Sequence, residues 1–310
     1  MKASGSTHPG GMMKTAAAVL VPFACVLLSA SGRAQPGRRP VEQLPGRVVD
    51  VAAGEFFLRA PDTIPAGLVT FRLSQIGDRL TNPAKVEAEN LAPATRENDP
   101  TRAFHMLWVA RLEPGRTMSE WYEAHVKDEP TPWAVELGGP AAAEPPGTSN
   151  ATMVLEPGNY VLVCHVGSAR ADKSRSHLLK GMFRGLTVLP GSAAKAEMPR
   201  ADAFARITGT GQIELQGTLR QGPQRIRVIN ETARSHEFIV VRVKPGRTAR
   251  EAVTWRRTDG STHPFASLGG FSDVRPGTTL TTTIDFGVGG HVLWTSRTPE
   301  TSLAVTILER

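Results

Sequence analysis

The sequence predicts an all-β protein made of two tandem β-sandwiches, and an internal repeat is the first observation behind this. His105 and His236 each open the pattern H-x5-R-[LV]-[EK]-P-G-R-T, 131 residues apart. Within each copy the apolar runs are short and rich in β-branched residues, and Pro-Gly pairs separate them. Short apolar runs between turn signals are typical of sandwich strands, and a repeat at a fixed offset indicates two copies of one unit.

The elements follow the same order in both copies. We expect strands at 68–73, 106–112 and 160–166 in the first copy, and at 225–229, 238–243 and 291–294 in the second. The segments after the first Pro-Gly turn of each copy, 117–126 and 248–255, are expected to form short helices. Their tryptophans, Trp121 and Trp255, are interpreted as structural residues that pack on the core.

The amino-terminal residues 1–34 have the pattern of a secretory signal peptide. Lys14 precedes an apolar run of 14 residues, and small residues follow as far as Ala34. A helix needs about 20 apolar residues to cross a bilayer, so this run is too short to span one. We therefore expect a periplasmic or secreted protein with no integral membrane segment after signal removal. An uncleaved single anchor is the alternative.

The rest of the chain divides into two domains. The expected boundaries are 48–189 for the first domain, 190–205 for a linker and 206–310 for the second domain. Three of the 36 basic residues and none of the 29 acidic ones precede residue 35, so the net charge of +7 falls to about +4 without the signal. A charge this small argues against a nucleic-acid partner, which would require many phosphate contacts.

Cysteine usage leaves one thiol in the exported chain. Cys25 lies inside the signal, so Cys164 has no internal disulfide partner. Two interpretations stay open at this point, a small buried hydrophobic residue or a thiolate that holds a metal.

The residues around Cys164 suit a metal. His105, Cys164, His177 and Met182 provide two imidazoles, a thiolate and a thioether, which is the ligand set of a blue copper electron-transfer site with a weak axial methionine. The second copy has Thr295 at the position of Cys164 and lacks twelve residues where the second histidine and the methionine would lie. We expect that copy to be metal-free, with a hydrogen-bonded histidine at its start.

These motifs resemble the cupredoxins, and more closely a bacterial group of two-repeat, cupredoxin-like secreted proteins. The resemblance is carried by the segments FHMLWVARLEPG, WAVELGGP, SNATMVLEPGNYVLVC and SHLLKGMFRGLTV. It implies two tandem cupredoxin-like Greek-key β-sandwiches, the second degenerate, with one type 1 copper near one end of the first. The sequence departs from the family in the gap between Cys164 and His177, where twelve residues replace the two to four that are usual in small blue copper proteins.

The function that we expect is one-electron transfer between redox proteins, with one copper ion in the first domain. A metal-free binding or scaffold module and a copper storage or delivery protein are the alternatives. No Gly-x-Ser-x-Gly, Walker-type or His-Glu-x-x-His motif is present, so an enzyme is not expected. His165 should lie on the strand face opposite Cys164 and be exposed. The basic loop 170–180 is interpreted as solvated, or alternatively as a guide for an acidic partner.

Overall fold

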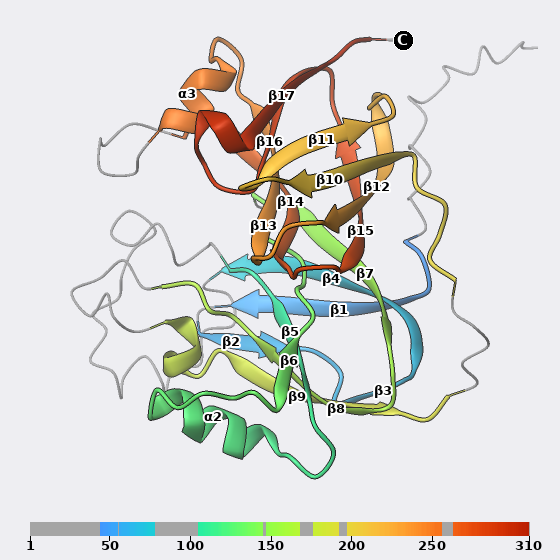
Figure 1. The fold of residues 1–310 in the computed structure, drawn as a ribbon, viewed down its shortest axis with the longest axis vertical. Helices are drawn as coiled ribbons and strands as arrows, with labels where there is room; N and C mark the ends of the chain where they lie inside the picture. Colours follow the sequence, from blue (N-terminus) through green and yellow to red (C-terminus); the bar gives the residue numbers. More distant parts are fainter. Residues whose placement is uncertain are drawn as a thin grey trace, which may run out of the picture. The chain divides into compact units, whose positions relative to one another are not determined.

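Three β-sheets and two short α-helices make up the part of the chain that the computed structural model describes, residues 44–54, 56–77, 105–144, 147–167, 176–191, 197–255 and 263–309 (Figure 1). The predicted all-β fold class is therefore confirmed. The predicted signal peptide lies outside the described residues. None of the helices in the described segments has the length and apolar character needed to cross a membrane.

The largest sheet contains strands from both copies of the repeat. Its order is β11-β10-β12-β15-β7-β4-β1-β2. In chain order these strands are β1 (Arg47–Gly54), β2 (Phe57–Arg59), β4 (Gly67–Gly77), β7 (Thr148–Leu155), β10 (Ala203–Thr208), β11 (Gln212–Gln216), β12 (Gly222–Asn230) and β15 (Thr279–Phe286).

Each copy adds a second sheet of its own. The first copy has a five-stranded sheet of order β3-β9-β8-β5-β6, and the second has a four-stranded sheet of order β14-β13-β16-β17. Their strands are β3 (Thr63–Pro65), β5 (Trp108–Leu112), β6 (Ala134–Glu136), β8 (Gly158–Val163), β9 (Phe183–Leu189), β13 (His236–Val243), β14 (Phe265–Val274), β16 (Gly289–Trp294) and β17 (Ser302–Ile307). The chain passes from β4 to β5, back to β7 and on to β8, so it alternates between the two sheets as a Greek key does.

The two copies meet through equivalent strands. β7 and β15 are related by the 131-residue offset and lie side by side in the large sheet, where Thr152 pairs with Thr281. From this junction the order β7-β4-β1-β2 in one direction matches β15-β12-β10-β11 in the other. Pro140 and Phe271, which the offset also relates, form an antiparallel bridge. The contacts between the copies thus follow a pseudo-two-fold arrangement.

The two α-helices lie at equivalent positions of the two copies. α2 (Met118–Val126) and α3 (Ala249–Thr254) both start at a capping box, formed by Thr117 with Glu120 and by Thr248 with Glu251. In a capping box the side chains of the first and fourth residues satisfy backbone N–H groups that the helix leaves free. The predicted helices are therefore confirmed, and they begin at the expected Pro-Gly turns.

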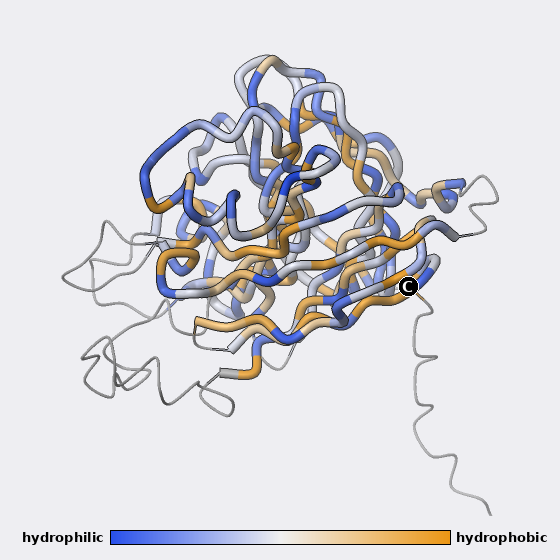
Figure 2. The backbone as a smooth tube through the Cα atoms, turned by 90° about the horizontal axis from the view of Figure 1, so that it is seen from below, coloured by the Kyte–Doolittle hydropathy of each residue, from blue (hydrophilic) through white to orange (hydrophobic). Residues whose placement is uncertain are grey.

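Alternating burial along the strands builds the core. Hydrophobic stretches of the tube gather toward the inside, and hydrophilic stretches lie mostly on the outer turns (Figure 2). One cluster contains residues of both copies, including Phe71 and Phe271, and it also holds Cys164 and Met182. On the outer side of the five-stranded sheet, Trp121 of α2 packs with Val161 and Val163, as the sequence predicts for this tryptophan.

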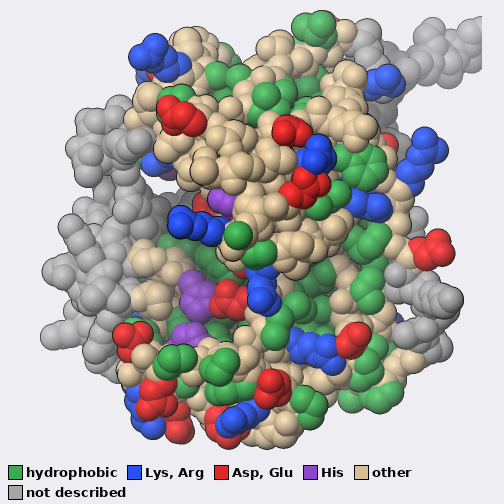
Figure 3. Space-filling view, in the orientation of Figure 1, with side chains coloured by type: hydrophobic (Ala, Val, Ile, Leu, Met, Phe, Trp, Pro, Cys, Tyr) green, Lys and Arg blue, Asp and Glu red, His purple; other side chains and the backbone are tan. Residues whose placement is uncertain are grey.

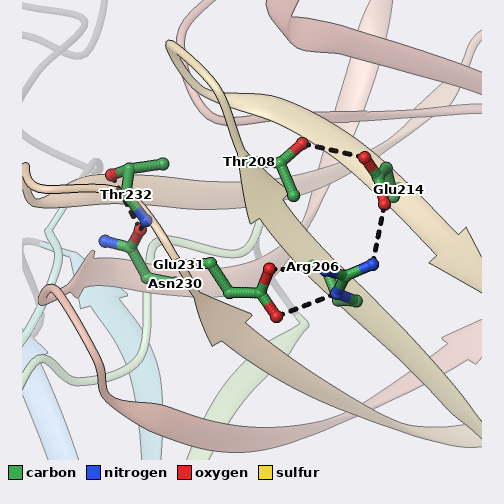
Figure 4. Close-up of polar contacts among 6 residues, drawn as sticks. All are labelled: Arg206, Thr208, Glu214, Asn230, Glu231 and Thr232. Atoms are coloured by element: carbon green, nitrogen blue, oxygen red, sulfur yellow. Dashed lines mark hydrogen bonds and ion pairs between the residues drawn. The ribbon is translucent and has the colours of Figure 1, made fainter.

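Strand β10 begins at Ala203, inside the segment 190–205 that the sequence interprets as a linker. Its buried Ala203 and Ala205 alternate with half-buried neighbours, which makes this stretch a strand rather than a spacer. Arg206 of β10 binds Glu231 after β12 through two hydrogen bonds of 2.9 and 2.6 Å, and it binds Glu214 of β11 at 2.9 Å (Figure 4). These ion pairs tie the three strands together at the surface.

Candidate metal centre

Three side chains that could hold a metal come together inside the first sandwich. His105 lies three residues before β5, Cys164 follows directly after β8, and His177 opens the short 3-10 helix η2 (His177–Lys180). Their ligand atoms all lie within 4.8 Å of one another, and all three residues are buried. In the described part of the chain this is the one group of at least three His, Cys, Asp or Glu residues with such spacing.

Two ring nitrogens and the cysteine sulfur lie close together at this site. The Nδ1 atoms of His105 and His177 are 3.2 Å apart, and the Sγ of Cys164 is 3.6 Å from the same Nδ1 of His177. The two imidazole rings are tilted by 57° with centroids 5.0 Å apart. Both nitrogens and the sulfur are therefore close enough to one another to share a ligand.

The long loop between Cys164 and His177 is closed at its base. The backbone N–H of His177 donates to the carbonyl of Val166 at 2.8 Å, and Gly167 forms an antiparallel bridge with Ser176. Because these bonds join the two ends of the loop, its length does not separate the imidazole from the sulfur. The sequence left open whether His177 reaches Cys164, and the structure brings them together.

Met182 is placed next to this group by the main chain. Its N–H donates to the carbonyl of His177 at 3.0 Å, and its carbonyl accepts from the N–H of Cys164 at 3.0 Å. Gly181 between η2 and Met182 has a φ of 91°, a left-handed conformation that glycine adopts without steric cost. The Met182 side chain is fully buried in the same core cluster as Cys164.

A glutamine on the opposite sheet holds the backbone of His105. The side-chain amide of Gln75 on β4 donates to the His105 carbonyl at 2.8 Å and accepts from its N–H at 3.2 Å. His105 precedes β5, and this pair of bonds ties its backbone to the neighbouring sheet. Sequence analysis missed Gln75, because a polar residue near the end of a strand has no distinctive pattern.

Burial and nearby charge keep the His177 imidazole neutral. Loss of hydration is the main cause that lowers the pKa of His177 to about 3, and His105 and Lys180 add repulsion. At neutral pH the ring therefore offers a lone pair without first losing a proton, which is the form that binds a metal.

Lys180 corrects the prediction of a solvated basic loop. This last residue of η2 is 2% exposed, and its Nζ lies 4.8 Å from the ring centroid of Phe56. The Phe56 ring in turn meets the His177 ring edge-on, with centroids 5.3 Å apart. The amphipathic stem of a lysine can follow apolar surface, and an aromatic face attracts its ammonium. The rest of the predicted loop, 170–175, lies outside the described residues.

His165 is less exposed than predicted. Its side chain lies opposite Cys164, as expected, but it is only 24% exposed. The Trp108 ring packs against it with ring centroids 5.3 Å apart, and a carboxylate oxygen of Glu136 lies 3.2 Å from its Nε2. This pairing is the main cause that lowers the pKa of Glu136. Figure 3 shows histidine side chains at the surface beside an acidic one, whereas His105 and His177 are 0% and 1% exposed.

The equivalent place in the second copy is held by hydrogen bonds. The hydroxyl of Thr295, which stands where the first copy has Cys164, donates to the carbonyl of Gly211. His236 pairs with the hydroxyl of Thr232 at 3.0 Å, so the predicted hydrogen-bonded histidine is confirmed. A Cβ on Gly211 would meet the Thr295 hydroxyl at 2.8 Å and the His236 ring at 3.0 Å, which shows how closely this backbone approaches both side chains.

Comparison with known proteins gives structural similarity only. No protein-family model matches the sequence, and no curated protein matches it. Reduced auracyanin from Roseiflexus castenholzii is similar at 16% identity over 47% of this chain and 98% of that one, with a TM-score of 0.26. A copper-containing nitrite reductase from Thermus scotoductus is similar at 9% identity over 84% and 61%, with a TM-score of 0.22. A copper nitrite reductase from Nitrosomonas europaea is similar at 13% identity over 86% and 85%, with a TM-score of 0.21.

Because these TM-scores are low, the fold is assigned from the chain's own strand order. Each copy has a parallel first pairing, β1 with β4 and β10 with β12, and each places this sheet opposite a second sheet that the Greek-key path fills. The sequence resemblance implied this architecture for both copies. The strand order therefore gives two β-sandwiches, which is the architecture that the sequence resemblance implied.

Proposed function

We propose that this protein is an exported one-electron-transfer protein that binds a single copper ion in its first sandwich. His105, Cys164 and His177 would hold the ion as a type 1 site, and Met182 would be the weak axial ligand. Copper would supply the one-electron couple, since thiolate and thioether suit Cu(I) and imidazole suits both oxidation states. The redox partners would be proteins of the periplasm or the cell exterior.

The observation that carries the proposal is the spacing of the three donor atoms. Metal–nitrogen bonds of about 2.0–2.1 Å and metal–sulfur bonds of about 2.3 Å, the lengths found in zinc sites, put neighbouring ligand atoms roughly 3.2–3.7 Å apart. The nitrogens here are 3.2 Å apart, and the sulfur is 3.6 Å from one of them. All three donor atoms lie within 4.8 Å of one another, so the side chains are close enough to share one ion without rearrangement of the fold.

The surrounding residues favour electron transfer over exchange of ligands. The three donor residues are buried, and Gln75 and the base of the loop fix His105 and His177 through backbone hydrogen bonds. Rigid, dry donors change little when the charge of the ion changes, and this keeps the reorganisation that accompanies electron transfer small. A storage or delivery protein would instead need the ion to enter and leave readily.

The test is the visible spectrum and the metal content of the copper-loaded full chain. We expect one copper per chain and a strong visible thiolate band, which Cys164→Ser should abolish. His105→Gln should lower the copper content, whereas its repeat equivalent, His236→Gln, should not. This matched pair separates ligand loss from general effects of losing a histidine.

Other outcomes distinguish the remaining functions. Copper content near zero with an intact fold would support a metal-free binding or scaffold module. Tight Cu(I) binding without a reversible couple would support storage or delivery. Equal copper content in His105→Gln and wild type would contradict the proposed site.

A further inference from the structure

A buried positive charge lies beside the candidate metal centre. Lys180 is among the largest side chains that are almost fully buried, and it is the fourth residue of the single turn of η2 that begins with His177. The helix turn and the following Gly181 fix its main chain, and its side chain lies buried against the Phe56 ring. The Lys180 ammonium therefore lies inside the protein, next to the site.

Phe56 connects this charge to a ligand. Its ring centroid lies 4.8 Å from the Lys180 Nζ and 5.3 Å from the His177 ring centroid, which it meets at 73°. Phe56 is 5% exposed and has a φ of 59°, a left-handed conformation that is costly for a residue with a side chain. Strained residues of this kind persist where packing holds them, often at functional sites. Here the strained residue holds its ring against both groups.

The electrostatic consequence follows from burial. Opposite and like charges interact more strongly in a protein interior than in water, because the effective dielectric constant is lower. A nearby ammonium therefore disfavours the more positive state of a bound ion. Among the described residues, Lys180 and His105 are the groups whose charge acts on His177.

We propose that Lys180 sets the reduction potential of the copper site, by favouring Cu(I) over Cu(II) through its fixed charge beside His177. This inference rests on the proposed function. In the step concerned, one electron from a donor protein converts Cu(II) to Cu(I), and no bond or proton at Lys180 changes. The Phe56 ring keeps the ammonium in place.

The test compares copper-loaded full-length variants by spectroelectrochemical titration. Lys180→Met keeps the length of the side chain and removes the charge, so its midpoint potential should fall. The ratio of Cu(I) to Cu(II) affinity should drop by roughly tenfold, which corresponds to about 59 mV. Lys180→Arg should retain most of the potential, and Lys244→Met, at an exposed ion pair of the second copy, should leave it unchanged.

Two results would overturn the inference. One is a Lys180→Met potential equal to that of the wild type. The other is an equal fall in Lys180→Met and Lys180→Arg, which would show that packing and not charge matters. Should Lys180→Met not yield folded protein, Lys180→Gln provides the same comparison.

Failure of the proposed function looks different. In that case the wild-type protein itself, treated with copper, would show no thiolate band and no reversible couple. Alternatively, the wild type shows both the thiolate band and the reversible couple, while the midpoint potential of Lys180→Met equals that of the wild type. This result would support the copper site and refute only the role of Lys180.

Discussion

Replacing Gln75 by leucine should loosen copper binding without changing any ligand. The variant loses the two hydrogen bonds, 2.8 and 3.2 Å long, that hold the backbone of His105. At about 1 kcal/mol for each bond, the free energy of unfolding should fall by about 2 kcal/mol. Residues that orient ligands through hydrogen bonds typically contribute about 10–100-fold to metal affinity. We therefore expect a loss of that size for copper.

The assay pairs a chelator competition for copper with urea denaturation of the same samples. Gln216→Leu is the matched control, because Gln216 is exposed on β11 in the other copy. The control should keep both copper affinity and stability within error. If Gln75→Leu lost stability but bound copper as tightly as the wild type with the same spectrum, the idea that Gln75 orients His105 would be refuted.

Two further predictions concern stability. Asn150 is 6% exposed and binds the backbone of Thr283 through bonds of 2.7 and 2.8 Å, so Asn150→Ala leaves a buried N–H and C=O without partners and should cost about 2–4 kcal/mol in urea denaturation. A loss below about 1 kcal/mol, or an equal loss in the exposed Asn159→Ala, would contradict this. Pairing with His165 lowers the pKa of Glu136 below its usual value of 4.5. The pair therefore stabilises the fold at pH values above 4.5, and this stabilisation is lost as the pH falls through the lowered pKa. The stability difference between wild type and Glu136→Gln should therefore disappear in acid, and a difference that persisted to pH 2 would show that the carboxylate charge is not its cause.

The elements that could be predicted from the sequence are those with a local signal. The repeat, the short β-branched runs and the Pro-Gly turns lie within a few residues of one another, and they correctly indicated β5, β8, β13, α2 and α3. Alternation along a strand correctly put Cys164 and His165 on opposite faces. The four candidate ligands were recognisable because their chemical types are uncommon together.

What the sequence did not indicate depends on contacts between distant segments. The junction of β7 with β15 joins residues more than 120 positions apart, and no turn signal specifies such a pairing. Phe56 and Lys180 lie in different segments of the chain. Their place beside the candidate site follows from the contacts of the Phe56 ring with His177 and with Lys180, which the sequence does not indicate. Lysines are rarely buried, so the expectation of a solvated Lys180 followed the usual preference, which the aromatic contact overrides here.

The second copy also reaches the candidate metal centre of the first, and this connection can be tested. The hydroxyl of Ser272 on β14 donates to the carbonyl of Leu107, two residues after His105, at 2.6 Å. Ser267 on the same strand makes a bond of the same length to the carbonyl of Ala142, which lies far along the chain from every candidate ligand. Ser272→Ala and Ser267→Ala should each cost about 1 kcal/mol of stability, but Ser272→Ala alone should alter the copper affinity and the visible band, because only its partner adjoins a ligand. Identical spectra in the two variants would mean that the second sandwich stabilises the chain without shaping the site.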